Sequence, residues 1–329
     1  MRKISLWRVL PRLAAAVLAC VAWGVHAEAD KWPSRPVTII VPFPPGGPSD
    51  TVVRAVAQKM SASLGQSFVI ENRPGASGNI GTAAVAHATP DGYTLLGTGA
   101  PIVTASALYP KLNYAPLKDL APLALLGSTP VFVWVNKTMP VADMKTLMAT
   151  VKAKPGSYNF SSSAPATLAH LSALYLFDET GAQLVHLNYK GSMQGVTDFL
   201  GGVYPIDFEV MQPLAPHMAN GAVRPLAVVG TKRSPLMPDV PSLGELGLPA
   251  LDVSPFLVLM APSGTPAAIQ ARASAAAREA LKSPEVRARL KAIYFQPDEG
   301  TEPAAASAWL RAQTERWGAI IRKHKLTVE

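Results

Sequence analysis

Short apolar runs alternate with helical repeats along the first part of the chain. Residues 37–43 (VTIIVPF) form a continuous apolar run of strand length, as expected for a strand covered on both faces. A helix is predicted next, because apolar side chains recur at helical spacing at Val52, Val53, Val56, Met60 and Leu64. Further strands are expected at 68–71 and 93–97, with a helix between them that ends near His87. This rhythm predicts a mainly parallel, doubly wound sheet.

A second series of the same kind begins near Val131. Strands are predicted at 131–135, 158–160, 184–187, 206–210 and 226–229, with helices at 141–153, up to about 178, and up to 200. The proline-rich segment 234–249 is loop-like, and a strand at 256–260 is expected to return to the first sheet. Two helices, 266–282 and 303–324, complete the chain. The two series suggest two similar lobes.

The N-terminus has the pattern of a secretory signal peptide. Four cations precede an uncharged apolar stretch at 13–25, and Val25-His26-Ala27 is a small-x-small cleavage pattern, so residues 1–27 are predicted to be removed. A transmembrane anchor is disfavoured, because spanning needs about 20 apolar residues. Residues 17–20 loosely resemble a lipoprotein box, which leaves lipid anchoring at Cys20 as a minor alternative.

Removal of this leader changes the charge and the cysteine content. The full chain has 30 Lys and Arg against 22 Asp and Glu, and loss of Arg2, Lys3, Arg8 and Arg12 lowers the formal charge from +8 to +4. Nucleic-acid binding is not expected, since no basic stripe with interleaved aromatic residues remains. The leader also holds the one cysteine, so stability must come from packing of a large core, which suits a bacterial periplasm.

Four predicted junctions between a strand and a helix are rich in small residues. They are Gly46-Gly47, 75–79, 161–163 and Gly191-Ser192. Helix N-termini offer unpaired N–H groups and partial positive charge, so junctions that face one cleft would form a carboxylate or phosphate cradle. The alternative is that α/β folds carry small residues at such turns for steric reasons alone. Both interpretations remain open from the residues themselves.

No catalytic or metal-binding set is found in the sequence. The segment 75–79 fails the G-x-S-x-G pattern at its last position, and neither a Walker nor a G-x-G-x-x-G motif is present. The histidines lack metal-ligand spacing, so neither metal nor cofactor is expected, and His170 is interpreted as a packed or capping residue. A hydrolase that uses a serine of 161–163 would lack a matched base. The protein is therefore not expected to be an enzyme.

Several motifs together resemble one known family. They are Trp32–Pro36, Pro42-Phe43 with Gly46-Gly47 and Asp50, Glu71–Gly75, Gly78–Gly81, Pro90–Leu96, Tyr189–Gly191, Lys232–Ser234 with Pro238–Pro241, and Ala261–Pro266. In this combination they resemble the Bug family, the periplasmic substrate-binding receptors of tripartite tricarboxylate transporters. The resemblance spans nearly the whole mature chain.

The resemblance implies a two-lobed α/β fold of the type II-like periplasmic-binding-protein (Venus flytrap) class. Each lobe would contain a mainly parallel, doubly wound sheet, and crossing strands would join the two lobes. Lobe 1 is expected at 31–127 plus 251–329, and lobe 2 at 128–250. A monomer in the periplasm would close over a small carboxylate and deliver it to integral-membrane permease subunits. The alternative is a sensor that presents its closed form to a membrane signalling protein.

Ligand-binding residues follow from the same resemblance. Lobe 1 would contribute Phe43, Gly46, Gly47, Asp50, Ser77, Gly78, Asn79 and Thr98, and lobe 2 Ser162, Ser163, Thr167, Tyr189 and Gly191. Glu209 stands where some relatives carry an Asp that meets amino-acid ligands. This chain departs from the family pattern at Ala100-Pro101-Ile102, at 164–169 and at Asn188. Because these changes remove donors, we expect a less polar ligand, such as an aromatic or aliphatic monocarboxylate.

Overall fold

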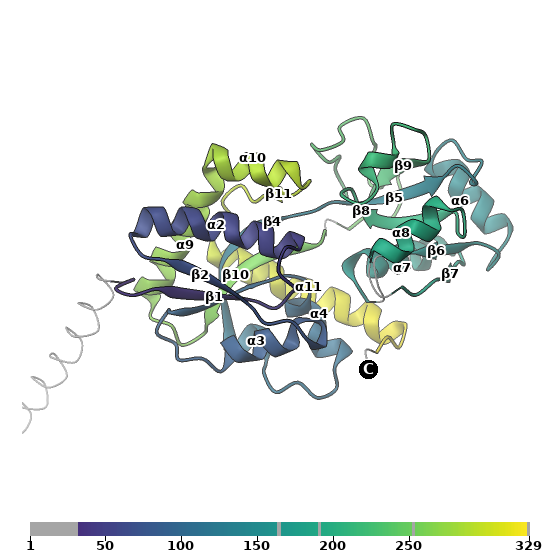
Figure 1. Cartoon of the computed structure of the whole chain (residues 1–329). Coiled ribbons are helices and arrows are strands. Elements are labelled where there is room, and N and C mark those ends of the chain that lie inside the picture. The colour runs from purple at the N-terminus through teal and green to yellow at the C-terminus, as the bar shows by residue number, and fades with distance from the viewer. Residues whose placement is uncertain (1–31, 163–165, 190–191, 252–253, 328–329) are drawn as a thin grey trace, which may run out of the picture.

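The computed structural model describes residues 32–162, 166–189, 192–251 and 254–327, and Figure 1 shows two groups of elements side by side. The predicted signal peptide at 1–27, with Cys20, lies outside the described residues, and so do Ser163 and Gly191. Among the described residues, no helix combines the length and the apolar character that crossing a membrane requires.

The first sheet has six strands in the order β11-β4-β10-β3-β1-β2. They are β1 (Val37–Val41), β2 (Phe68–Asn72), β3 (Thr94–Thr98), β4 (Leu120–Ser128), β10 (Phe256–Pro262) and β11 (Gln296–Pro297). Strand β1 pairs in parallel with β2 and β3, as predicted. Strand β10 returns to this sheet, as predicted, and runs antiparallel to both β3 and β4.

The second sheet has five strands in the order β7-β6-β8-β5-β9. They are β5 (Val131–Asn136), β6 (Asn159–Ser161), β7 (Val185–His186), β8 (Ile206–Val210) and β9 (Val223–Val228). Strand β6 pairs in parallel with β7 and β8, whereas β5 runs antiparallel to β8 and β9. Both sheets are thus mixed. This corrects the expected mainly parallel pairing: the chain leaves the first sheet through β4, enters the second through β5 and returns through β10.

Helices cover both faces of the first sheet. One face packs against α2 (Pro48–Leu64), α9 (Ala267–Lys282) and α10 (Pro284–Ala292), and the other against α3 (Asn79–Ala86), α4 (Pro101–Leu108) and α11 (Pro303–Lys323). The short helix α5 (Pro116–Asp119) precedes β4. Successive strand residues serve opposite faces: Ile39 packs in the α2 and α9 core, and Ile40 in the α11 core. This two-sided burial explains why β1 reads as a continuous apolar run.

The second sheet is likewise covered on both faces. Helices α6 (Met144–Ala153) and α7 (Leu168–Thr180) pack on one face, and α8 (Ser192–Leu200) packs on the other. Two short 3-10 helices, η2 (Ala76–Gly78) and η3 (Ala215–His217), lie in connections.

Two features join the two groups of elements. Only Thr129 and Pro130 separate β4 from β5, so these strands form the outward crossing. Helix α11 packs against β4 and α4 and also against α7 (Figure 1). At that contact Asp178 of α7 pairs with Lys323 Nζ at 2.8 Å and with His324 Nε2 at 2.9 Å. The C-terminal end of α11 therefore anchors the C-terminal end of α7, and the N-terminal end of α7 lies at the candidate site.

Candidate ligand site

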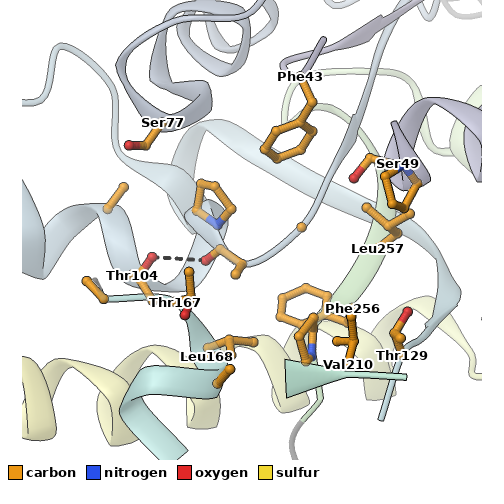
Figure 2. A pocket seen from close by; sticks show the side chains of 18 of the residues that line it. Phe43, Ser49, Ser77, Thr104, Thr129, Thr167, Leu168, Val210, Phe256 and Leu257 are labelled. Atoms are coloured by element: carbon orange, nitrogen blue, oxygen red, sulfur yellow. Dashed lines mark hydrogen bonds between the residues drawn. The ribbon is translucent and has the colours of Figure 1, made fainter. Parts of the chain in front are cut away.

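A cavity of ≈ 440 Å³ lies where elements of the two sheets meet (Figure 2). Its volume falls in the range usual for sites that hold small ligands. The residues that line it are Phe43, Pro48, Ser49, Ser77, Gly99, Ala100, Pro101, Thr104, Ala105, Leu108, Tyr109, Thr129, Ala166, Thr167, Leu168, Ala169, Glu209, Val210, Gln212, Pro255, Phe256, Leu257 and Phe295. Both sheets and the strand crossing between them contribute to this wall.

The cavity lies beyond the carboxyl ends of several strands. Phe43 follows β1, Gly99 follows β3, and Val210 ends β8. The N-termini of α2, α4 and α7 reach the same cavity. This is the place where open α/β sheets bind ligands, since backbone N–H groups and the positive ends of helix dipoles converge there.

The N-terminus of α7 is the best-defined polar element of the wall. Thr167 is its N-cap in an extended conformation (φ −67, ψ 160), and Thr167 Oγ1 accepts a hydrogen bond from His170 N at 3.3 Å. Leu168 and Ala169 are the first two residues of the helix and line the cavity. N–H groups in a first turn have no acceptor within their own helix. Those of Leu168 and Ala169 are therefore suited to bind an anion.

A neutral histidine supports this helix start. His170 Nδ1 accepts a hydrogen bond from Ala166 N at 3.0 Å, which fixes the turn before α7. The ring stacks on His186, with centroids 3.9 Å apart and an interplanar angle of 13°. Burial, with a smaller effect of His186 and His324, lowers the pKa of His170 to about 3. At neutral pH His170 therefore orders the loop without adding charge, in agreement with the expected packed or capping role.

The rest of the wall is largely apolar. Phe43, Phe256 and Leu257 face the cavity in Figure 2, and the hydroxyl groups of this part come from Ser49, Ser77, Thr104, Tyr109 and Thr129. Thr104 Oγ1 donates a hydrogen bond to Ala100 O at 3.2 Å, so this hydroxyl is bonded to the backbone one turn before it. Among the described residues, no Lys, Arg or His lines the cavity. An anion there would depend on backbone amides and hydroxyl groups.

Four of the residues expected from the family resemblance line this cavity. They are Phe43, Ser77, Thr167 and Glu209. Positions where the chain departs from the family pattern also line it, namely Ala100, Pro101, Ala166, Leu168 and Ala169. Ile102 instead points into the core that contains Trp317. Five of the departures thus fall on the cavity wall, whereas Ile102 and Asn188 do not line it.

Asp50 does not line the cavity and is occupied by protein partners. Its carboxylate accepts hydrogen bonds from Gly46 N at 3.0 Å, Arg54 Nε at 2.8 Å and Asn72 Nδ2 at 2.9 Å. Burial opposes ionisation, but the bonds from Arg54, Gly46 and Asn72 outweigh it and hold the pKa of Asp50 below its usual value. Asp50 therefore shapes the loop that presents Phe43 and Ser49, and Gly46 is part of that loop.

Other expected residues that the structure describes do not line the cavity. Asn79 Oδ1 accepts from Tyr114 OH at 2.7 Å, and Tyr189 OH donates to Asp198 at 2.8 Å. Thr98 is buried at the end of β3. Gly47 and Gly78 occupy the turns before α2 and α3, and neither of them lines the cavity. Gly78 has a left-handed backbone (φ 96), a conformation that favours glycine, whereas Gly47 is extended (φ −73, ψ 171).

The serine run at 161–163 has a histidine partner that the sequence did not predict. Ser162 Oγ lies 3.0 Å from His186 Nε2, which corrects the expectation that these serines lack a nearby base. Burial lowers the pKa of His186, so its ring is neutral at pH 7. Ser162 is, however, 0% exposed and does not line the cavity. A solute in the cavity would not reach its hydroxyl.

Sequence reasoning missed the part of the wall that is built by the strand crossing. Thr129, Pro255, Phe256 and Leu257 flank the points where β4 ends and β10 begins, and Phe295 comes from the segment before β11. The predicted strand at 256–260 was the available signal. Only its pairing with β4 brings the start of that strand to the cavity.

Comparisons with known proteins agree with this architecture. The profile described as "Tripartite tricarboxylate transporter family receptor" matches residues 52–326. Protein BugT of Bordetella pertussis is 36% identical over 319 residues, which cover 95% of this chain and 98% of BugT. The structure of MatC from Rhodopseudomonas palustris with bound malate is 32% identical, with a TM-score of 0.72, and covers 88% of this chain and 100% of that one. R. palustris Rpa4515 with adipate is 30% identical, with a TM-score of 0.76 and coverage of 90% and 100%. The chain belongs to the tripartite tricarboxylate transporter receptor family.

Proposed function

We propose that this protein is a periplasmic receptor that captures a small carboxylate between two lobes and delivers it to the membrane permease of a tripartite transporter. The observation that carries this proposal is the start of α7, which opens into an apolar cavity shared by both sheets. The malate named for MatC and the adipate named for Rpa4515 support a carboxylate as the ligand class.

The carboxylate would bind at the amides of Leu168 and Ala169, with the Thr167 hydroxyl beside them. Such a site needs no arginine, because helix N-termini bind anions with backbone N–H groups and the helix dipole. Ser77, across from Thr167 in Figure 2, would supply a further hydroxyl from the first group of elements. The remaining residues of the expected set would shape the loops around this point.

The body of the ligand would lie against the apolar part of the wall. Phe43, Phe256 and Leu257 offer contact surface, and alanine or proline occupies positions 100, 101 and 166. A hydroxyl-rich acid would leave its polar groups without partners against such a surface, which costs about 1–3 kcal/mol for each group. We therefore expect an aromatic or aliphatic carboxylate.

Lobe closure would signal that the site is occupied. We assign lobe 1 to 31–127 plus 251–329 and lobe 2 to 128–250, which places the crossing strands and the contact between α11 and α7 at the hinge. The receptor would act as a monomer without a metal or cofactor, reach the periplasm by cleavage of residues 1–27, and catalyse no reaction.

A thermal-shift screen followed by calorimetry tests the proposal. Aliphatic and aromatic monocarboxylates, dicarboxylates, tricarboxylates, amino acids and sugars would be compared on the mature chain. A true ligand at 100 times its Kd should stabilise the protein by ~2.7 kcal/mol. Stabilisation by no carboxylate, or by neutral sugars alone, would refute the proposal.

A further inference from the structure

A second cavity, of ≈ 540 Å³, adjoins the ligand cavity at one end of the first sheet. Strands β4 and β11, the segment after β11 and helix α11 contribute to its wall, and Leu125, Ala305 and Trp309 give it apolar surface. Phe256, the first residue of β10, is the one described residue that lines both cavities. The side chain of Phe256 therefore lies at the boundary between them.

A row of paired strand residues marks this boundary. Phe256 of β10 pairs with Ser128 of β4, and Ser128 pairs with Gln296 of β11. All three line the second cavity, whereas Thr129 and Phe295, the chain neighbours of two of them, line the ligand cavity. Successive side chains of an extended segment point to opposite sides. The end of the first sheet thus lies between the two cavities.

Packing holds Phe256 in place at this boundary. The residue is 5% exposed, and its ring packs edge-on against Trp309, with centroids 4.8 Å apart and an interplanar angle of 85°. The Phe256 backbone is also confined, because a Cβ at Gly99 would lie 2.5 Å from Phe256 O. In Figure 2 the Phe256 ring faces the ligand cavity. The ring is therefore a fixed part of the wall.

We infer that Phe256 is a specificity-determining residue that limits the length of the acid that the receptor accepts. The inference rests on the proposed function and narrows its ligand class. An acid whose carboxylate occupies the start of α7 extends its apolar body to Phe256, and the ring separates that body from the second cavity. Without the ring, the end of a longer chain would enter the second cavity and contact Leu125, Ala305 and Trp309.

The length of the carbon chain is the variable that reports this limit. Each CH2 group that moves from water into an apolar site raises affinity by about 4-fold. Wild-type affinity should rise by roughly this factor for each added carbon until the chain reaches Phe256. Further carbons would meet the ring or remain in water, so affinity should then stop rising or fall.

Calorimetry with straight-chain acids from butyrate to dodecanoate, and with phenyl-substituted acids from phenylacetate to phenylhexanoate, tests the inference on the mature protein at pH 7. Wild type should show an optimum length within at least one series. Phe256→Ala should move that optimum to a longer acid. Its preference for the acid two carbons beyond the wild-type optimum should increase on the order of 16-fold, the product of two CH2 gains. Phe256→Leu should shift the optimum in the same direction by less.

Two control variants separate the second cavity from a general loosening of the site. Ala305 is exposed on α11 and lines the second cavity alone. Ala305→Phe should leave the wild-type optimum unchanged, but in the Phe256→Ala background it should shorten the optimum again, because the added ring occupies the space that the longer chain would use. Leu257→Ala, on the wall of the ligand cavity, should lower affinity at every length without a shift in the optimum.

Several outcomes would overturn the inference alone. They are an unchanged optimum in a folded Phe256→Ala protein, a wild-type affinity that rises through both series, and a shift that Ala305→Phe does not reverse. Binding of another carboxylate, but of neither series, would also overturn it. If wild type bound no carboxylate at all, the proposed function itself would be refuted. If Phe256→Ala did not fold, Phe256→Leu would decide, since an unchanged optimum there has the same meaning.

Discussion

Substitution of Asp50 by Asn distinguishes a residue that shapes the site from one that binds the ligand. Asp50 is 3% exposed, and all three of its partners are donors: Gly46 N, Arg54 Nε and Asn72 Nδ2. An amide has a single acceptor oxygen, and its NH2 group would face at least one of these donors. Asp50→Asn therefore breaks the network while it preserves the shape of the side chain.

The expected loss of stability follows from these contacts. A hydrogen bond to a charged group contributes about 1.5–3 kcal/mol. The pair with Arg54 counts for less, because the Arg54 side chain is 45% exposed and solvent screens it. Asn can keep, in weaker uncharged form, the two bonds that Oδ2 accepts from Gly46 N and Arg54 Nε, but it loses the bond from Asn72 Nδ2. We therefore expect a loss of about 2–4 kcal/mol in the free energy of unfolding. In a chain of this size that lowers Tm by roughly 5–12 °C.

The pH dependence provides an internal check. The pKa of Asp50 is lowered in the folded state, so its contribution is complete above the unfolded pKa of about 3.9. It is lost as the pH falls through the folded value. The difference in stability between wild type and Asp50→Asn should therefore be constant from pH 7 to about 5 and should shrink below about 4.

Urea unfolding, followed by far-UV circular dichroism, measures this difference, and calorimetry measures ligand affinity in the same samples. The exposed Asp239, changed to Asn, is the matched control and should stay within about 0.5 kcal/mol of wild type. Unchanged stability of Asp50→Asn together with abolished binding would refute our interpretation, since it would place the Asp50 carboxylate on the ligand.

Three further predictions concern α7 and its surroundings. Thr167→Ala should destabilise the protein by about 1 kcal/mol in urea unfolding and weaken carboxylate binding. Thr167→Ser should retain both stability and affinity. Equal affinity in the alanine variant would show that the Thr167 hydroxyl takes no part in ligand binding. His170 has a folded pKa of about 3, so the free energy of unfolding should fall by up to about 1.4 kcal/mol per pH unit as the pH drops below about 6.5. A folded His170→Gln protein should show a smaller slope of stability against pH. An identical slope would mean that other groups cause the pH dependence. Ser162→Ala should cost about 1 kcal/mol because His186 loses a buried partner, and neither it nor wild type should hydrolyse p-nitrophenyl esters; wild-type turnover that the variant lacks would instead indicate an enzyme.

Elements with a clear apolar pattern were predictable from the sequence. The strand expected at 206–210 is β8 (Ile206–Val210), and the helix expected at 266–282 is α9 (Ala267–Lys282). Periodicity reports burial of faces, and both elements bury well-defined faces. Periodicity does not report the direction of a neighbouring strand, so the antiparallel crossings were not predicted.

Helix α4 and strand β4 were missed for local reasons. Helix α4 is apolar on most of its surface, because it packs against the sheet and against α11, so no amphipathic period marks it. Strand β4 contains Pro122, a residue that argues against a central strand in sequence reasoning. Irregular pairing between β4 and β10 accompanies this part of the strand.

The candidate site was predictable only in part, because proximity in space depends on the crossing. The family resemblance predicted the lining residues Phe43, Ser77, Thr167 and Glu209, which lie in recognisable loops and, for Glu209, on a predicted strand. Sequence alone could not tell whether Asp50 points to a ligand or to Asn72. The sequence also could not show that Phe256 lies at the cavity, because its position depends on the register between β10 and β4.

The most direct test of the account is a crystal structure of the mature protein with a bound monocarboxylate that calorimetry has identified. We predict that one carboxylate oxygen lies about 2.7–3.1 Å from the backbone N of Leu168 or Ala169, with the apolar body against Phe43 and Phe256. A carboxylate held by a cationic side chain, or bound away from α7 with its anionic end beside Glu209, would contradict the account.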